Sequence, residues 1–129
     1  MAKTLSSGHN VPAEATGLSR LLSLHGEIWE VGDGFWVKID AKVVVPDEGR
    51  PHGIAYSLTL HSPAGERLIG FDNAHAVGEG SGPGRRIEMP FDHAHKRGRE
   101  RPYVYSDANT LLDDFWTAVE DILKEEGVL

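Results

Sequence analysis

Hydrophobic residues near the C-terminus recur with the period of an α-helix. Between residues 111 and 123 the apolar positions are spaced three and four apart, and they are Leu111, Leu112, Phe115, Trp116, Val119, Ile122 and Leu123. This spacing places them along one side of a helix. Ser106 or Asp107 is positioned to cap the start of the helix, and Gly127 is positioned to end it. The pattern predicts an amphipathic helix that packs its apolar side on another layer.

The middle of the chain follows the two-residue alternation that is typical of β-strands. The clearest case is the segment HGIAYSLTLHS at residues 52–62, in which every second residue from Ile54 to Leu60 is apolar. Further strands are predicted from apolar segments separated by turn residues. They lie at residues 27–31, 33–45 and 66–74, around 86–94, and at 102–106.

Residues 13–24 predict a short N-terminal helix with its leucines on one side. Residues 1–12 lack the apolar core of a signal peptide, so we expect a flexible leader. A chain of 129 residues suits a single domain, which we place at residues 13–129. The predicted fold class is α+β: a meandering antiparallel β-sheet of about five to six strands, with the C-terminal helix packed on one face.

Composition narrows the class of protein. The chain has no cysteine, which excludes disulfides and thiolate metal sites. It has no run of eighteen apolar residues, so we predict no membrane-spanning segment. A cytoplasmic location is the expectation that fits both observations.

Charge is distributed unevenly along the chain, although the formal net charge is −7. Six of the thirteen Lys and Arg residues fall within residues 85–101, and they are Arg85, Arg86, Lys96, Arg97, Arg99 and Arg101. Residues 107–126 are acidic, with Lys124 as their single basic residue. Because local charge decides where a polyanion docks, an acidic net charge does not exclude a nucleic-acid partner.

Two histidines stand next to this basic run in the segment FDHAHKRGRERPYVY at residues 91–105. His93 and His95 are two residues apart, so on a strand their side chains leave the same face about 7 Å apart. Converging imidazoles can act as general acid and base near neutral pH, or they can ligate a metal. A metal would need a third ligand, such as His75 or Asp72. A pair of surface histidines without a chemical role is equally compatible with this spacing.

Arginine beside histidine suits phosphodiester chemistry, because a guanidinium neutralises the developing phosphorane while an imidazole moves protons. The predicted catalytic residues are His93, His95 and Arg99. The predicted substrate-binding residues are Lys96, Arg97, Arg101, Tyr103, Asp72 and Asn73. Tyr103 either stacks on a base or belongs to the core. The basic run read alone is also compatible with a solvated loop.

Four motifs follow one another along the chain: FDN at 71–73, DHAH at 92–95, RERPY at 99–103 and LLDDFWTAVEDI at 111–122. In this order they resemble the TumE family, a set of small bacterial proteins regarded as toxins of type II toxin–antitoxin pairs. The resemblance covers roughly residues 52–123, with weaker correspondence in 27–45. It implies RNA cleavage that blocks translation, or a related attack on RNA, kept silent by a small helix-turn-helix antitoxin.

The resulting interpretation is a toxin-like protein that acts on RNA as a metal-independent endoribonuclease without a cofactor. RNA and the antitoxin are the expected partners, and a homodimer is compatible with the sequence. One alternative is a metal-dependent phosphoesterase or nuclease with His93 and His95 as ligands. Another is a non-enzymatic binding module whose basic stripe grips RNA or an acidic partner.

Overall fold

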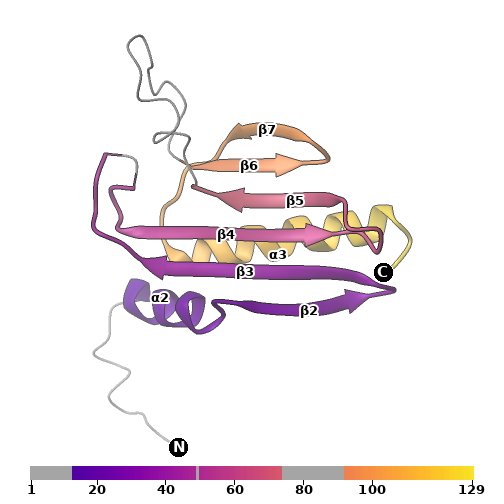
Figure 1. The fold of residues 1–129 in the computed structure, drawn as a ribbon, viewed down its shortest axis with the longest axis horizontal. Helices are drawn as coiled ribbons and strands as arrows, with labels where there is room; N and C mark the ends of the chain where they lie inside the picture. Colours follow the sequence, from indigo (N-terminus) through magenta and orange to yellow (C-terminus); the bar gives the residue numbers. More distant parts are fainter. Residues whose placement is uncertain (1–12, 49, 74–91) are drawn as a thin grey trace, which may run out of the picture.

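The computed structural model describes residues 13–48, 50–73 and 92–129 (Figure 1). Its elements in chain order are α2 (Ala13–Ser23), β2 (Glu27–Gly32), β3 (Phe35–Val43), β4 (Ile54–His61), β5 (Arg67–Asp72), β6 (His93–Lys96), β7 (Arg99–Pro102) and α3 (Ala108–Glu125). The predicted leader at 1–12 and the first part of the strand predicted around 86–94 lie outside the described residues.

The described strands form a six-stranded sheet in the order β2-β3-β4-β5-β6-β7, and every neighbouring pair is antiparallel. Sequential strands are therefore adjacent throughout, and the predicted meander is confirmed. Figure 1 shows α3 running behind the sheet and α2 at the end of β3. The fold is α+β, as predicted.

A two-residue turn connects β6 to β7. Arg97 and Gly98 both have positive φ, 49° and 84°, which is the signature of a type I′ hairpin turn. This turn corrects one predicted boundary, because the last strand covers Arg99–Pro102 rather than residues 102–106. Because the turn is tight, strand pairing resumes directly at Lys96 and Arg99. Beyond Pro102, the backbone N–H of Tyr103 still donates to the carbonyl of Asp92, and the chain then leaves the sheet.

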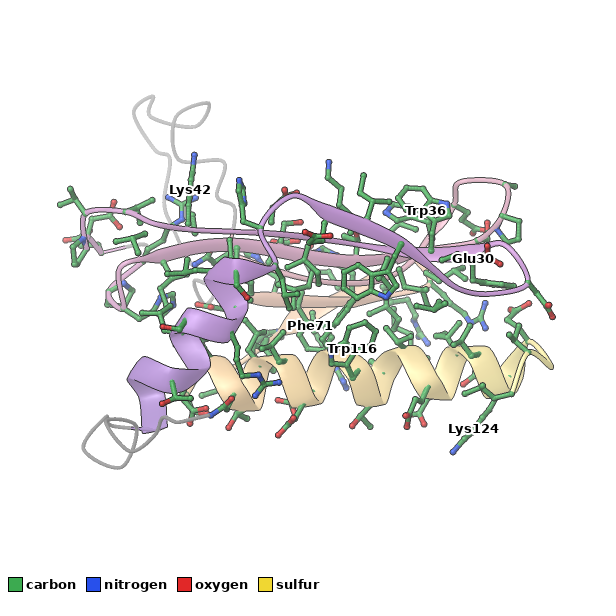
Figure 2. All side chains as sticks on the ribbon, turned by 90° about the horizontal axis from the view of Figure 1, so that it is seen from below. Glu30, Trp36, Lys42, Phe71, Trp116 and Lys124 are labelled. Atoms are coloured by element: carbon green, nitrogen blue, oxygen red, sulfur yellow. The ribbon has the colours of Figure 1, made fainter. Side chains whose placement is uncertain are left out.

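The core lies between α3 and one face of the sheet. Asp107 caps α3 by accepting a hydrogen bond from the backbone N–H of Thr110 at 2.7 Å. Six of the seven residues of the predicted apolar stripe are buried, with Phe115 completely inaccessible to solvent, and Trp116 is partly buried. In Figure 2 Phe71 and Trp116 lie between the sheet and α3, whereas Trp36 and Lys42 lie on the opposite face.

This opposite face, which we call the open face, is covered by no described helix. No helix in the described part of the chain is long and apolar enough to cross a membrane. The open face is where strand alternation places the polar side chains of the sheet.

Candidate active site

His93 and His95 share the open face, as their spacing predicted. The strand register pairs His93 with Asp72 and His95 with Gly70. Ala94 lies between them on the other face, where it is buried in the core. Because directly paired residues in an antiparallel ladder share a face, Asp72 lies beside both histidines.

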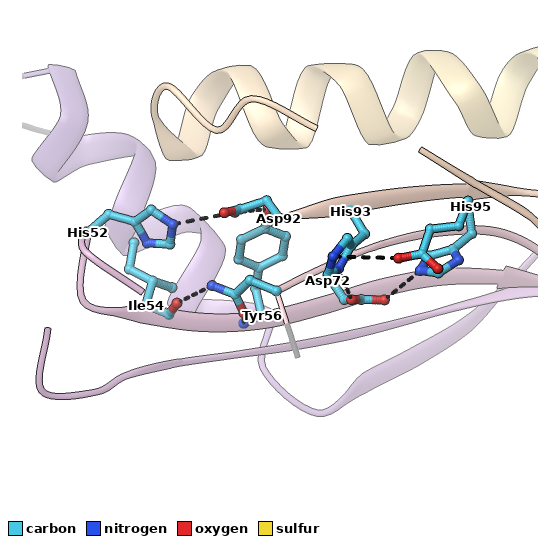
Figure 3. A network of polar contacts seen from close by, with 9 residues as sticks. His52, Ile54, Tyr56, Asp72, Asp92, His93 and His95 are labelled. Atoms are coloured by element: carbon cyan, nitrogen blue, oxygen red, sulfur yellow. Dashed lines mark hydrogen bonds and ion pairs between the residues drawn. The ribbon is translucent and has the colours of Figure 1, made fainter. Parts of the chain in front are cut away.

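One carboxylate contacts both imidazoles. Nε2 of His95 lies 3.2 Å from Oδ2 of Asp72, and Nδ1 of His93 lies 3.7 Å from Oδ1 (Figure 3). The two ring centroids are 6.3 Å apart. All three side chains are mostly buried, so Asp72 holds the rings at a set spacing rather than meeting them transiently. The structure therefore brings together three of the residues predicted from the sequence.

A second carboxylate completes the cluster. Glu100 on β7 is paired with His95, and its Oε2 lies 3.5 Å from Nε2 of His93. Both ring nitrogens of His93 thus face carboxylates. Glu100 is not among the site residues predicted from the sequence, because the last predicted strand, at residues 102–106, begins after it. The observed strand β7 includes it. We call Asp72, His93, His95 and Glu100 the histidine cluster.

Arg67 places a cation on the open face near His95. A Cβ atom built on Gly70 would lie 3.3 Å from Cδ of Arg67 and 3.5 Å from its Nε. The Arg67 side chain therefore extends over Gly70, the residue paired with His95. It has this space because position 70 lacks a side chain. Sequence reasoning missed Arg67, which is distant in the chain and separated from the basic run.

The basic run faces the other way. Arg99 is paired with Lys96, and Arg101 is paired with Ala94, so all three side chains belong to the side of the sheet that carries α3. The register set by the two-residue turn pairs His93 and His95 with Pro102 and Glu100, so Arg99 and Arg101 face away from the histidines. The structure does not bring the predicted phosphate-stabilising Arg99 to the histidines.

Two of the predicted substrate-binding cations are already paired with acids. Lys96 Nζ lies 3.4 Å from Glu125, and Arg97 Nη2 lies 3.0 Å from Glu125 and 2.9 Å from Glu126. The hydrogen bonds to these carboxylates raise the pKa of Arg97, and the bond from Arg97 lowers the pKa of Glu125. These contacts tie the β6–β7 turn to the end of α3.

Tyr103 and Asn73 hold the fold together rather than face the histidine cluster. The Tyr103 ring packs edge-on against Phe71, with centroids 5.0 Å apart. Asn73 is completely buried, and its Oδ1 accepts a hydrogen bond from the backbone N–H of Tyr56 at 3.0 Å. Its Nδ2 donates to the carbonyl of Ile54 at 2.6 Å. The Asn73 side-chain amide therefore links the end of β5 to the backbone of β4.

A separate polar network lies on the helix side of the sheet (Figure 3). The Tyr56 hydroxyl donates to Oδ2 of Asp92 at 2.5 Å, and Nε2 of His52 lies 3.3 Å from the same oxygen. Burial, followed by the bond to Asp92, raises the pKa of Tyr56. Because Asp92 directly precedes His93, it points away from the open face.

Metal-ligand geometry is absent from the part of the chain that the structure describes. There, no group of three or more His, Asp or Glu side chains could hold a metal ion. In the histidine cluster, both ring nitrogens of His93 and Nε2 of His95 face carboxylate oxygens. Metal ligands instead converge on a common point. The arrangement is better suited to orienting imidazoles and moving protons.

The fold and this cluster define a small α+β protein with two carboxylate-held histidines on one face of an antiparallel sheet. The family model described as Toxin TumE matches residues 20–123. The chain therefore belongs to the TumE toxin family, as the resemblance predicted. Membership indicates the toxin component of a toxin–antitoxin system and implies an antitoxin partner. No curated protein and no solved structure matches the chain.

Proposed function

We propose that this toxin cleaves RNA by metal-independent acid–base catalysis at the histidine cluster. The observation that supports this proposal is the position of Asp72, whose two oxygens face one nitrogen of each imidazole. Two imidazoles in a fixed relation to each other are what transesterification of a phosphodiester requires, since one removes a proton while the other supplies one.

His95 acts as the base in this proposal. Its Nε2 faces Asp72 at 3.2 Å, which favours a proton on Nε2 and leaves the lone pair on Nδ1. Nδ1 takes the proton from the ribose 2′-hydroxyl as the 2′-oxygen attacks phosphorus. Asp72 orients the ring and balances the charge that His95 gains.

His93 acts as the acid. It donates a proton to the 5′-oxygen as the bond between that oxygen and phosphorus breaks. The products are a 2′,3′-cyclic phosphate and a 5′-hydroxyl, and no water is consumed. Asp72 faces Nδ1 of His93 and keeps the ring in place, and Nε2 delivers the proton once the more exposed Glu100 carboxylate turns aside for the substrate.

Arg67 replaces Arg99 as the residue that stabilises the phosphorane. Its side chain extends over Gly70, which lies on the same strand as Asp72 and is paired with His95. A guanidinium presents paired N–H donors to phosphate oxygens, and it acts most strongly when negative charge accumulates in the transition state.

An aromatic pair lies on the open face close to Arg67. Trp36 and His61 are paired across β3 and β4, and their rings stack with centroids 4.0 Å apart and planes 10° apart. His61 is in turn paired with Arg67. Aromatic rings next to a cation suit an unpaired base beside the scissile phosphate, so we propose single-stranded RNA as the substrate.

RNA cleavage by purified variants tests this function. His93→Ala and His95→Ala should each slow single-turnover cleavage by about 10²–10⁴-fold with little change in RNA affinity. Lys124→Ala, an exposed basic residue on α3, is the control and should cleave normally. Mass spectrometry should find a 2′,3′-cyclic phosphate on the product.

Chelation separates the proposed function from its alternatives. Activity should persist after prolonged EDTA treatment. Loss of cleavage that is restored by zinc or manganese would instead support a metal-dependent nuclease. RNA binding without any cleavage, shifted equally by all substitutions, would support a non-enzymatic binding module.

A further inference from the structure

One edge of the sheet is open to strand addition. β7 is the last strand in the order, and among the described residues no strand pairs with its outer side. All four residues of β7 are exposed. An edge strand of this kind presents unpaired backbone groups to a partner, here with no N–H at Pro102.

A groove of about 540 Å³ runs beside this edge, between the β6–β7 hairpin and α3. Ile69, Phe71 and Ala94 of the sheet and Ala118 of α3 supply its apolar surface, and Asp121 lies on the helix side. Arg99 and Arg101 line it from β7. The groove is thus apolar within and basic along its outer edge.

The charges of the hairpin divide into two pairs. Lys96 and Arg97 form ion pairs with the carboxylates at the end of α3. Arg99 and Arg101 form no ion pair with any other described residue. The side of the hairpin that faces α3 therefore already binds carboxylates through Lys96 and Arg97. Arg99 and Arg101 can bind further carboxylates from a partner.

We propose that β7 and this groove bind an extended acidic segment of the antitoxin by strand addition. Arg99 and Arg101 are two residues apart on one face, so they match carboxylates at alternate positions of an added strand. An apolar residue following on the same face would enter the groove. The inference rests on family membership and not on the proposed ribonuclease activity.

An acidic segment fits this edge better than a second copy of the chain. Pairing two β7 strands would bring four arginines together, and like charges on facing edges oppose self-association. The apolar interior of the groove also suits apolar side chains better than a phosphate backbone. RNA is the alternative occupant that the experiment must distinguish from a peptide.

Peptide binding followed by NMR tests this surface. The probe is a ten-residue peptide that alternates glutamate and valine, and the same peptide with lysine for glutamate is its control. The acidic peptide should shift the backbone amides of Arg99–Arg101, and its affinity should fall as salt rises. Arg99→Glu with Arg101→Glu should weaken binding at least about tenfold, the loss expected for two charge contacts.

Matched variants keep the test specific. Lys38→Glu with Lys42→Glu makes the same charge change on exposed residues of the open face and should leave peptide affinity unchanged. Circular dichroism verifies folding of both double variants. Equal losses in both, no shift at β7, or amide shifts at β7 with a ten-nucleotide oligouridylate but not with the acidic peptide would overturn the proposal. None of these results depends on whether the protein cleaves RNA.

Discussion

The hydroxyl of Tyr103 donates a hydrogen bond to Oδ2 of Asp114 at 2.6 Å. It connects the chain just beyond β7 to the second turn of α3, across the edge of the core. The same ring packs edge-on against Phe71. A residue predicted to bind substrate therefore holds the histidine-bearing hairpin and the helix together.

Removing this hydroxyl should destabilise the protein while leaving the ring in place. Tyr103→Phe should lower the free energy of unfolding by about 1–2 kcal/mol, because a partly buried hydrogen bond to a carboxylate is lost. Urea denaturation measures the change. A double-mutant cycle with Asp114→Asn should show a coupling of similar sign, and additive effects would mean that the bond contributes nothing.

Alkaline pH should act on the same residue. Burial, followed by the bond to Asp114, raises the pKa of the Tyr103 phenol above its ordinary value of 10.0. The folded chain then keeps a proton that the unfolded chain releases, so the contribution of Tyr103 is complete below pH 10 and declines as pH rises further. Stability measured from pH 8 to 11 should fall less steeply in Tyr103→Phe. Parallel curves would show that the phenol is not protected by folding.

Phe115 should be the most costly position to truncate on α3. Its side chain is completely buried between α3 and the sheet and meets Phe71 and Trp116 edge-on. Phe115→Ala should cost about 3–5 kcal/mol, through lost burial and the cavity left behind. Thr117→Ala, on the exposed side of the same helix, is the control. An unchanged urea midpoint for Phe115→Ala would mean that the helix is peripheral.

Elements with a strong period were predictable from the sequence. The stripe around Phe115 had to be buried, and alternation from Ile54 to Leu60 identified a strand with one apolar face. The order of the sheet followed because strands that are consecutive in the chain are usually neighbours in a sheet. The periodicity of apolar residues within each segment was therefore enough to predict the architecture.

The composition of the site was less predictable, because it depends on register. A two-residue turn with Arg97 in the left-handed region starts β7 at Arg99, earlier than the strand predicted at 102–106. That shift placed Glu100, rather than Arg99, on the face of the histidines. Arg67 reaches the same face over Gly70, and only the three-dimensional pairing of β5 with β6 brings it there.

The two arginines now give opposite expectations for catalysis. Arg67→Ala should reduce the rate of the chemical step by about 10²-fold or more, since a cation directed at the phosphorane acts mainly in the transition state. Arg99→Ala should leave that rate unchanged, because Arg99 lies on the helix side of the sheet with Lys96. Single-turnover cleavage at saturating enzyme separates the chemical step from binding. Arg67→Lys should recover part of the rate, because the charge returns without the paired donors of a guanidinium. A slow Arg99→Ala beside a normal Arg67→Ala would mean that RNA reacts at the hairpin edge and that the open face has been assigned the wrong role.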